Sequence, residues 1–198
     1  MTTKKPMLSV IEALNFLLQA VKPVTEAESI PTIEANGRVL AQDQISQINV
    51  PPMDNTQMDG YAVRAAECVA GNAMLTVSQR IPAGHVGHPL AEGSVARIFT
   101  GALIPTGADA VVMQEQCEPD ESGSKVTVRH SPKSGEWIRR AGEDIKSGSV
   151  ILAAGTLLRA QEQGLAASVG LAMLPVLRKL RVAVFFTGDE LTMPGEPL

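Results

Sequence analysis

The sequence predicts a mainly β fold with a few helices, α+β overall. Residues 50–146 consist of short apolar runs separated by Gly, Pro, Asn, Asp and Ser, a pattern typical of a compact β domain. Helical patterns are found at residues 9–21 and 160–169. With 198 residues, 44% of them apolar, the chain is long enough to bury a core as one large domain or two small ones.

The first helix is predicted over residues 9–21. Ser9 and Glu12 have the spacing of a capping box, apolar residues recur at helical intervals, and Lys22-Pro23 ends the segment. Shorter signals follow: a strand at 29–31, a helical turn at 32–35, and a half-exposed strand over 38–48, where apolar and polar residues alternate loosely.

Further strands are expected in the β-rich region and after it. The expected segments are 73–78, 94–99, 110–117, 125–128 and 150–152, and the pair 110–117 and 125–128 is expected to form a hairpin with a longer loop. Residues 160–169 are expected to form a helix that Gly170 ends, although Arg159 and its neighbours offer no good N-cap.

Residues 180–186 are almost entirely apolar and lead into Thr187-Gly188-Asp189-Glu190. This pattern predicts the first strand of a parallel α/β sheet, which needs neighbours supplied by crossover units. The chain stops twelve residues after Phe186, so we expect the protein to continue past residue 198.

Composition argues against several partners. The net charge is −4 and the basic residues are scattered, so we expect no nucleic-acid partner. No apolar run approaches the ~20 residues of a membrane span, so we expect a soluble protein with no membrane partner. The two cysteines, Cys68 and Cys117, imply no disulfide framework, fit a reducing cytoplasm, and are expected to be buried apolar fillers.

The stretch from Pro51 to Arg64 is predicted to be a shaped loop. Two prolines fix the backbone angle φ, and Asp59-Gly60 is interpreted as a tight turn in which the glycine supplies a positive φ. The loop also contains Tyr61, the only tyrosine. A carboxylate is thus expected to be held at a bend.

Four short segments place a carboxylate or hydroxyl beside a glycine: 58–60, 100–102, 141–144 and 187–190. Glycine lets backbone N–H groups approach an anion, and carboxylates bind Mg²⁺ or move protons. Each segment alone is more simply explained as an ordinary turn. Together the four predict phosphate or metal-ion chemistry.

The sequence closely resembles a known family in four segments, which occur in the same order along the chain: 53–64, 97–115, 139–144 and 187–191. With their Met-Asp-Gly, Thr-Gly-Ala, Gly-Glu-Asp and Thr-Gly-Asp-Glu motifs, they resemble the molybdopterin molybdenumtransferase family, which includes bacterial MoeA and the gephyrin E domain. The resemblance implies a cytoplasmic enzyme of molybdenum cofactor biosynthesis that inserts molybdate into adenylylated molybdopterin, uses Mg²⁺ and releases AMP. It also implies molybdopterin adenylyltransferase as the upstream partner.

The resemblance further implies an elongated homodimer of several domains. Residues 1–26 would form an N-terminal helix and linker, with the helix packing on the α/β domain. Residues 27–47 and 147–177 would form a dimerisation domain, interrupted by an inserted β-rich domain at 48–146. Residues 178–198 would begin a truncated α/β substrate domain. The later substrate-binding loops of the family have no counterpart here, so we expect this chain alone to be inactive.

Carried over by motif, the resemblance assigns catalytic roles to Asp59, Thr100, Asp144 and Glu190. Asp59 and Glu190 would position metal or molybdate, and Thr100 would hydrogen-bond an oxyanion. Asp144 alternatively stabilises a hairpin turn. The residues expected to bind substrate are Met58, Gly60, Gly101, Asp189, Arg139 and Arg140, although the two arginines alternatively form a solvated charged edge. The residues that ligate the metal are not identified.

Two other functions remain open at this stage. The chain is alternatively a non-catalytic dimerisation or scaffold module, which the missing substrate loops favour. A Mg²⁺-dependent phosphohydrolase is the third hypothesis, and it rests only on the carboxylate and glycine motifs.

Overall fold

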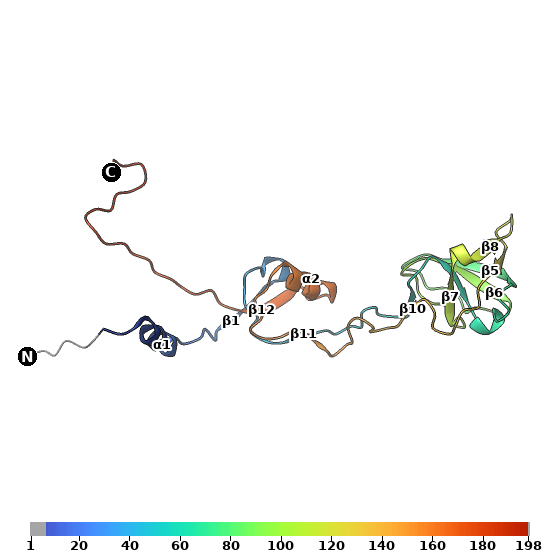
Figure 1. Cartoon of the computed structure of the whole chain (residues 1–198), viewed down its shortest axis with the longest axis horizontal. Coiled ribbons are helices and arrows are strands. Elements are labelled where there is room, and N and C mark those ends of the chain that lie inside the picture. The colour runs from blue at the N-terminus through green and yellow to red at the C-terminus, as the bar shows by residue number, and fades with distance from the viewer. Residues whose placement is uncertain (1–6, 198) are drawn as a thin grey trace, which may run out of the picture. The chain divides into compact units, whose positions relative to one another are not determined.

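The computed structural model describes residues 7–197 and divides into two compact units (Figure 1). One, the sheet unit, is Gln44–Leu152; the other, the flanking unit, is formed by the chain up to Asp43 and from Ala153 onward. The described residues contain twelve strands, two α-helices and three short 3-10 helices. The predicted mainly β fold with a few helices is confirmed.

A six-stranded sheet forms the centre of the sheet unit, with strand order β7-β4-β6-β5-β9-β8. Its members are β4 (Gly60–Val63), β5 (Ala73–Ile81), β6 (Ser94–Ile98), β7 (Ala110–Met113), β8 (Cys117–Pro119) and β9 (Lys125–Val128). Only β5 and β6 pair in parallel; the other neighbours are antiparallel. The strand predicted at 125–128 is confirmed. It forms a hairpin with β8, which shares only Cys117 with the predicted partner strand 110–117.

The sheet is curled because its two edge strands are nearly consecutive in sequence. Strands β7 and β8 lie at opposite ends of the strand order, yet only the 3-10 helix η3 (Gln114–Gln116) separates them. Three residues span at most about 10 Å, so the two edges must approach each other. The single strand predicted over 110–117 is therefore wrong: η3 divides it between the two edges.

Side chains of alternate residues enter two different hydrophobic clusters. Tyr61 and Val63 of β4 belong to one cluster, whereas Ala62 belongs to the other. This is the two-residue period of a strand, here with both faces covered. Cys68 and Cys117 are buried in the first cluster as predicted, and burial raises the pKa of their thiols to about 11 and about 12.

Two short ladders complete the sheet unit. Strand β3 (Asn55–Thr56) pairs with β10 (Ile138–Arg139), and β2 (Gln44–Ile45) pairs with β11 (Val150–Leu152). A further 3-10 helix, η2 (Ala65–Glu67), follows β4. The long strand predicted over 38–48 is wrong, because only β2 and isolated bridges at Val39 and Leu40 find partners there.

Among the described residues, the flanking unit contains one antiparallel strand pair and two α-helices. Strands β1 (Ala27–Pro31) and β12 (Met173–Leu177) pair, and η1 (Thr32–Glu34) and α2 (Ala160–Ser168) lie beside them. The predicted turn at 32–35 and the helix ended by Gly170 are confirmed. The buried large side chains of this unit are Leu40, Leu158, Leu174 and Val176.

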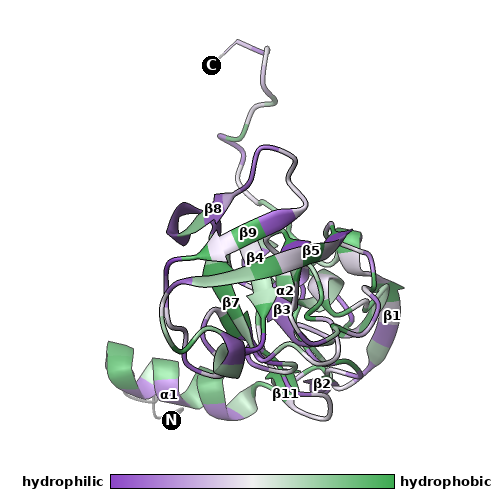
Figure 2. Ribbon diagram, turned by 90° about the vertical axis from the view of Figure 1, so that its right-hand side faces the viewer, coloured by the Kyte–Doolittle hydropathy of each residue, from purple (hydrophilic) through white to green (hydrophobic). Residues whose placement is uncertain are grey.

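Helix α1 (Val10–Ala20) has the predicted capping box. The Glu12 amide donates to the Ser9 hydroxyl, and the Glu12 carboxylate accepts the Ser9 N–H at 2.8 Å. None of its residues is buried, although it carries both hydrophobic and polar residues (Figure 2). The helix is therefore stabilised locally, without packing contacts from the described chain.

The apolar run at 180–186 does not form the predicted strand. Its residues have no β partner, and Phe185 and Phe186 are each 82% exposed. A strand needs hydrogen-bonding neighbours, and no described segment supplies them. Among residues 7–197, no helix combines the length and apolarity that crossing a membrane requires.

Candidate functional site

Asp59 and Thr100 form the centre of the candidate site. The Thr100 backbone N–H donates to Asp59 Oδ1 at 2.8 Å, and the Thr100 hydroxyl donates to the same oxygen at 2.9 Å. The two residues are 41 positions apart in sequence. The structure therefore brings together two of the three predicted catalytic residues that lie in the sheet unit, while the third, Asp144, pairs with Arg139.

A tight turn presents the Thr100 donors. The Ala102 N–H donates to the Phe99 carbonyl at 2.8 Å, and Gly101, with φ of +81°, occupies the third position, as a type II turn requires. The turn is tied to β3 because the Gly101 N–H donates to the Thr56 carbonyl at 2.9 Å. The local sequence Phe-Thr-Gly-Ala thus aims two donors at one carboxylate.

Gly60 serves a different purpose from the one predicted. It is the first residue of β4 and does not have a positive φ. A Cβ atom at this position would lie 2.0 Å from the Val112 carbonyl oxygen on the neighbouring strand β7. The predicted positive-φ turn at Asp59-Gly60 is wrong: glycine is needed here for close approach of two strands.

Met58 is fixed on the other side of the carboxylate. The Thr56 hydroxyl accepts the Met58 N–H at 3.1 Å and donates to the Met58 carbonyl at 2.7 Å. Thr56 itself is buried, with 1% of its surface exposed. The bend that carries Asp59 is therefore anchored in the core of the sheet unit.

Hydrogen bonding keeps Asp59 ionised. The Thr100 N–H, and next the Thr100 hydroxyl, lower the pKa of Asp59, and the positive charge of Arg97 adds to this. A carboxyl group with a lowered pKa is a poor proton donor near neutral pH. Asp59 is therefore suited to binding a cation or accepting a hydrogen bond.

A second group of charges surrounds the loop after β10. The Asp54 carboxylate accepts the Ala141 N–H at 2.8 Å and the Arg140 guanidinium at 2.6 Å, and the first of these bonds is the main cause of its lowered pKa. Arg139 pairs with Asp144 and lies 3.7 Å from the Glu143 carboxylate. Both predicted substrate-binding arginines thus have carboxylate partners within the chain.

Sequence reasoning assigned no role to Asp54, which pairs with Arg140. The available signal was the position of Asp54 within the Pro51 to Arg64 loop. It missed Arg97 too, which donates to the Gly60 carbonyl at 2.8 Å and to the Gln114 side chain at 2.6 Å. Asp189 and Glu190 belong to the flanking unit, in the exposed stretch after Leu177.

Three-residue metal clusters are absent from residues 7–197: no group of three or more His, Cys, Asp or Glu side chains could hold an ion. Mg²⁺ commonly takes one or two carboxylates, together with water and substrate phosphates. Both Thr100 bonds go to Oδ1 of Asp59, which leaves Oδ2 for such a ligand. This oxygen is of the kind that Mg²⁺ accepts as a single protein ligand.

The fold and the site define the chain as a curled, mainly β module that presents an ionised carboxylate fixed by a Thr-Gly turn. It belongs to the MoeA family: the model described as the MoeA N-terminal region, domains I and II, matches residues 8–170. The predicted family membership is confirmed.

Relatives with assigned names agree with this family. The chain is 41% identical over 196 residues to the molybdopterin molybdenumtransferase of Haemophilus influenzae, covering 97% of this chain and 47% of the relative. It is 40% identical over 187 residues to molybdopterin molybdenumtransferase 2 of Mycobacterium tuberculosis, covering 92% and 45%. The chain thus spans about half the length of these curated relatives.

Solved structures agree as well. Two structures of the molybdopterin biosynthesis MoeA protein of Pyrococcus horikoshii match this chain. One has a TM-score of 0.78 at 37% identity and covers 84% of this chain and 45% of its own. The other has a TM-score of 0.80 at 32% identity and covers 97% and 50%.

Proposed function

We propose that this chain is part of an enzyme of molybdenum cofactor biosynthesis that inserts molybdate into adenylylated molybdopterin and releases AMP. The names of the curated relatives support this function. The observation that carries it is the Asp59 carboxylate held by the two Thr100 donors, an arrangement that keeps an ionised oxygen at a fixed position.

In this proposal Asp59 Oδ2 would help to hold Mg²⁺, which would supply stabilisation of negative charge on the substrate when bound. Thr100 orients the carboxylate, and Met58, Gly60 and Gly101 shape the bend and the turn around it. Asp144 positions Arg139 through their ion pair. Arg140 positions Asp54 through a second ion pair. Asp189 and Glu190 act from the start of the α/β substrate domain.

The proposal includes the organisation of the whole protein. It is a cytoplasmic homodimer that receives its substrate from molybdopterin adenylyltransferase and binds no nucleic acid. Residues 27–47 and 147–177 dimerise, 48–146 form the inserted β-rich domain, and 178–198 begin the α/β domain. The exposed apolar run at 180–186 supports this last assignment, since an α/β domain would supply its missing strand partners.

The test is molybdenum insertion by the full-length protein. We expect Asp59→Asn to lower the insertion rate about 100-fold or more, because the charge that binds the cation is removed. Asp120→Asn is the matched control: this exposed aspartate of the same unit also accepts a backbone N–H, from Lys125 at 3.2 Å. Circular dichroism checks that both variants fold. An Asp59→Asn rate equal to that of the control would remove Asp59 from the site.

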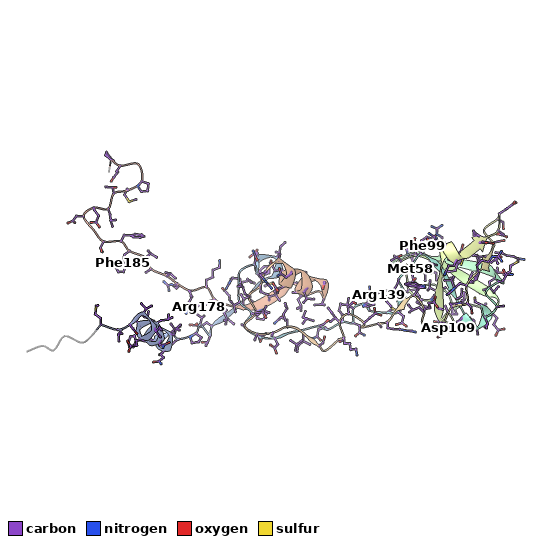
Figure 3. The ribbon with its side chains drawn as sticks, viewed as in Figure 1. Met58, Phe99, Asp109, Arg139, Arg178 and Phe185 are labelled. Atoms are coloured by element: carbon purple, nitrogen blue, oxygen red, sulfur yellow. The ribbon has the colours of Figure 1, made fainter. Side chains whose placement is uncertain are left out.

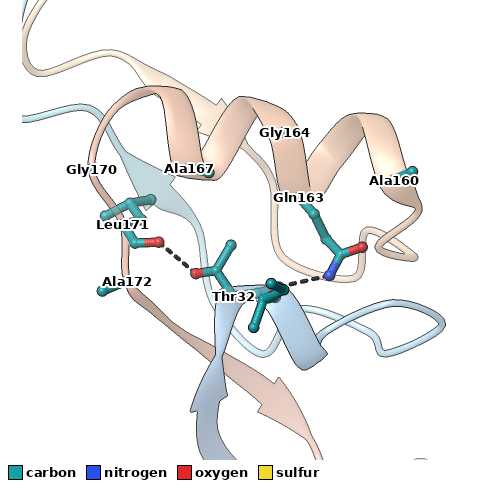
Figure 4. A pocket seen from close by; sticks show the side chains of 9 residues that line it. Thr32, Ala160, Gln163, Gly164, Ala167, Gly170, Leu171 and Ala172 are labelled. Atoms are coloured by element: carbon teal, nitrogen blue, oxygen red, sulfur yellow. Dashed lines mark hydrogen bonds between the residues drawn. The ribbon is translucent and has the colours of Figure 1, made fainter.

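A second candidate function is a non-catalytic dimer scaffold. An open groove of about 600 Å³ in the flanking unit favours it (Figure 4). It is lined by η1, α2 and the segment after α2, and most of the residues from α2 onward are alanine or glycine. Small residues let another backbone approach closely, and Ile33, 86% exposed, lies at the groove. The proposed occupant is a second copy of this chain.

Sedimentation of the 198-residue chain tests the scaffold. We expect a dimer that Ala167→Arg, which places a charge in the groove, converts to a monomer. Ser122→Arg, in the β8–β9 loop of the sheet unit, is the control and should remain dimeric. A wild-type chain that is monomeric at high concentration would contradict the scaffold.

A further inference from the structure

Three side chains of the sheet unit form a cationic and aromatic cluster next to the turn that binds Asp59. Arg97 on β6 lies opposite Arg80 on the parallel neighbour β5. Phe99 follows β6, and both guanidinium groups lie over its ring, at 4.5 Å for Arg80 and 4.4 Å for Arg97. We call Arg80, Arg97 and Phe99 the Arg-Phe cluster.

The charge of Arg80 is not paired within the described chain, and that of Arg97 acts on the Asp59 carboxylate without forming a salt bridge. Arg80 and Arg97 have no carboxylate at salt-bridge distance among residues 7–197, whereas each of the other four arginines of the sheet unit has one. Those ion pairs are Arg64 with Glu67, Arg129 with Glu118, Arg139 with Asp144 and Arg140 with Asp54. Like charges directly opposite on neighbouring strands repel each other, so an anion bound here would relieve an unfavourable interaction.

Arg80 and Arg97 differ in how many of their guanidinium N–H groups already donate hydrogen bonds within the chain. Arg97 is fixed by bonds to the Gly60 carbonyl, the Ile98 carbonyl and the Gln114 side chain. It also lies 5.3 Å from the Tyr61 ring. Arg80 is exposed, and its only described interaction is with the Phe99 ring. Arg80 is therefore the residue with free N–H groups for an incoming anion.

The cluster is continuous with the candidate site. Phe99 immediately precedes Thr100 in the turn that binds Asp59, and its carbonyl closes that turn by accepting the Ala102 N–H. Figure 3 labels Phe99 and Met58 within the sheet unit. A ligand placed on Phe99 would therefore lie next to the residues that hold the Asp59 carboxylate.

We propose that Arg80 and Phe99 bind the phosphate and the base of a nucleoside monophosphate group, which, resting on the proposed function, is the adenylyl end of the substrate. A guanidinium group matches phosphate oxygens with two parallel hydrogen bonds. An aromatic side chain stacks on a base, and a neighbouring guanidinium strengthens the contact. Arg97 acts as a positioning residue that holds the Phe99 ring.

Binding of AMP to the 198-residue chain tests this proposal. We titrate ¹⁵N-labelled chain with AMP, adenosine or inorganic phosphate and follow the amide signals of Arg80, Phe99 and Gly101. AMP is expected to shift these signals at lower concentration than adenosine or phosphate. Arg80→Gln should weaken AMP binding about threefold to fivefold, as for an exposed ion pair, and Arg80→Lys should weaken it less. Phe99→Leu should weaken AMP and adenosine but not phosphate.

Arg129→Gln is the matched control, since Arg129 is an arginine of the same sheet unit whose charge is already paired. It should bind AMP like the wild type. AMP binding that Arg80→Gln leaves unchanged, or shifts confined to other residues, would overturn the proposal. Phosphate binding as strong as AMP binding would overturn its nucleoside part.

This outcome is independent of the insertion assay. AMP bound through Arg80 in a protein that inserts no molybdenum would support the nucleotide site and contradict the proposed function. Full insertion activity, together with normal AMP binding by the Arg80→Gln variant, would support the proposed function and contradict the nucleotide site.

Discussion

The sheet unit and the flanking unit differ in what holds their elements in place. In the sheet unit all four residues of β4 are buried, and alternate side chains enter two clusters. In the flanking unit α1 has no buried residue, and no described residue after Leu177 forms a strand. A helix closes its hydrogen bonds locally, whereas a strand requires a partner segment. The difference shows that the candidate site depends on long-range pairing.

The largest effect is expected from Gly60→Ala. The new Cβ atom would lie 2.0 Å from the Val112 carbonyl oxygen, and a backbone atom in a central ladder has little room to move. We expect a loss of about 4 kcal/mol or more in the free energy of unfolding. Fluorescence of Trp137, the only tryptophan, reports urea unfolding of the sheet unit. A variant as stable as the wild type would contradict the strand contact.

A pair of truncations compares the two units directly. Ile98→Ala, at a fully buried position of β6, should cost about 2–5 kcal/mol of unfolding free energy, because it leaves a cavity. Leu17→Ala on α1, at a position 61% exposed, should change it by less than about 0.5 kcal/mol. Urea unfolding, followed by Trp137 fluorescence and by circular dichroism at 222 nm, measures both. A large cost at Leu17 would show that α1 packs against protein.

Gly164→Ala in α2 should stabilise the flanking unit. No atom lies within 4 Å of the added Cβ, and this glycine does not have a positive φ. Alanine in a helix interior is favoured over glycine by about 0.5–1 kcal/mol. Thermal unfolding followed at 222 nm, in dilute protein, should show the gain. A loss of stability would mean that the groove of Figure 4 has less space than the structure shows.

The smallest effect concerns acid stability at the start of α2. Hydrogen bonds from the Arg159 side chain lower the pKa of Glu162 from 4.5 to about 2. Because the folded-state pKa is depressed, the ionised carboxylate contributes stability above about pH 4.5, and this contribution is lost as the pH falls toward 2. Glu162→Gln should flatten the dependence of helicity on pH in that range. Parallel curves for variant and wild type would contradict it.

Glu162 also shows why sequence reasoning left the start of this helix open. Arg159 is a poor N-cap by residue type, but its N–H donates to the Glu162 carboxylate at 2.9 Å. The helix is thus capped from its third residue. The turn at Thr100 was easier to predict, because glycine is the residue that most readily adopts the positive φ found at Gly101.

The errors share one physical cause. In both cases the local pattern predicts a strand, but pairing with distant segments decides whether the strand forms. Residues 110–117 are divided by η3 between the two edges of the sheet, and residues 180–186 have no strand partner in the described chain. Asp59 and Thr100 were predictable because each lies in a short local motif, Met-Asp-Gly or Thr-Gly-Ala. Arg80 belongs to no recognisable local pattern, whereas Asp54 lies in the Pro51 to Arg64 loop.

The sequence by itself determined the features that local chemistry controls. These are the capping box at Ser9, the turn at Gly101, the mainly β composition and the family motifs. Only the tertiary structure decided that Gly60 is required by the Val112 carbonyl, that Arg139 and Arg140 are paired, and that Arg80 and Arg97 meet over Phe99. The physical reason is the sequence separation of the interacting residues. Caps and turns close within about four residues, whereas strand pairing, and the charged side chains that it places opposite each other, depend on segments far apart in the sequence.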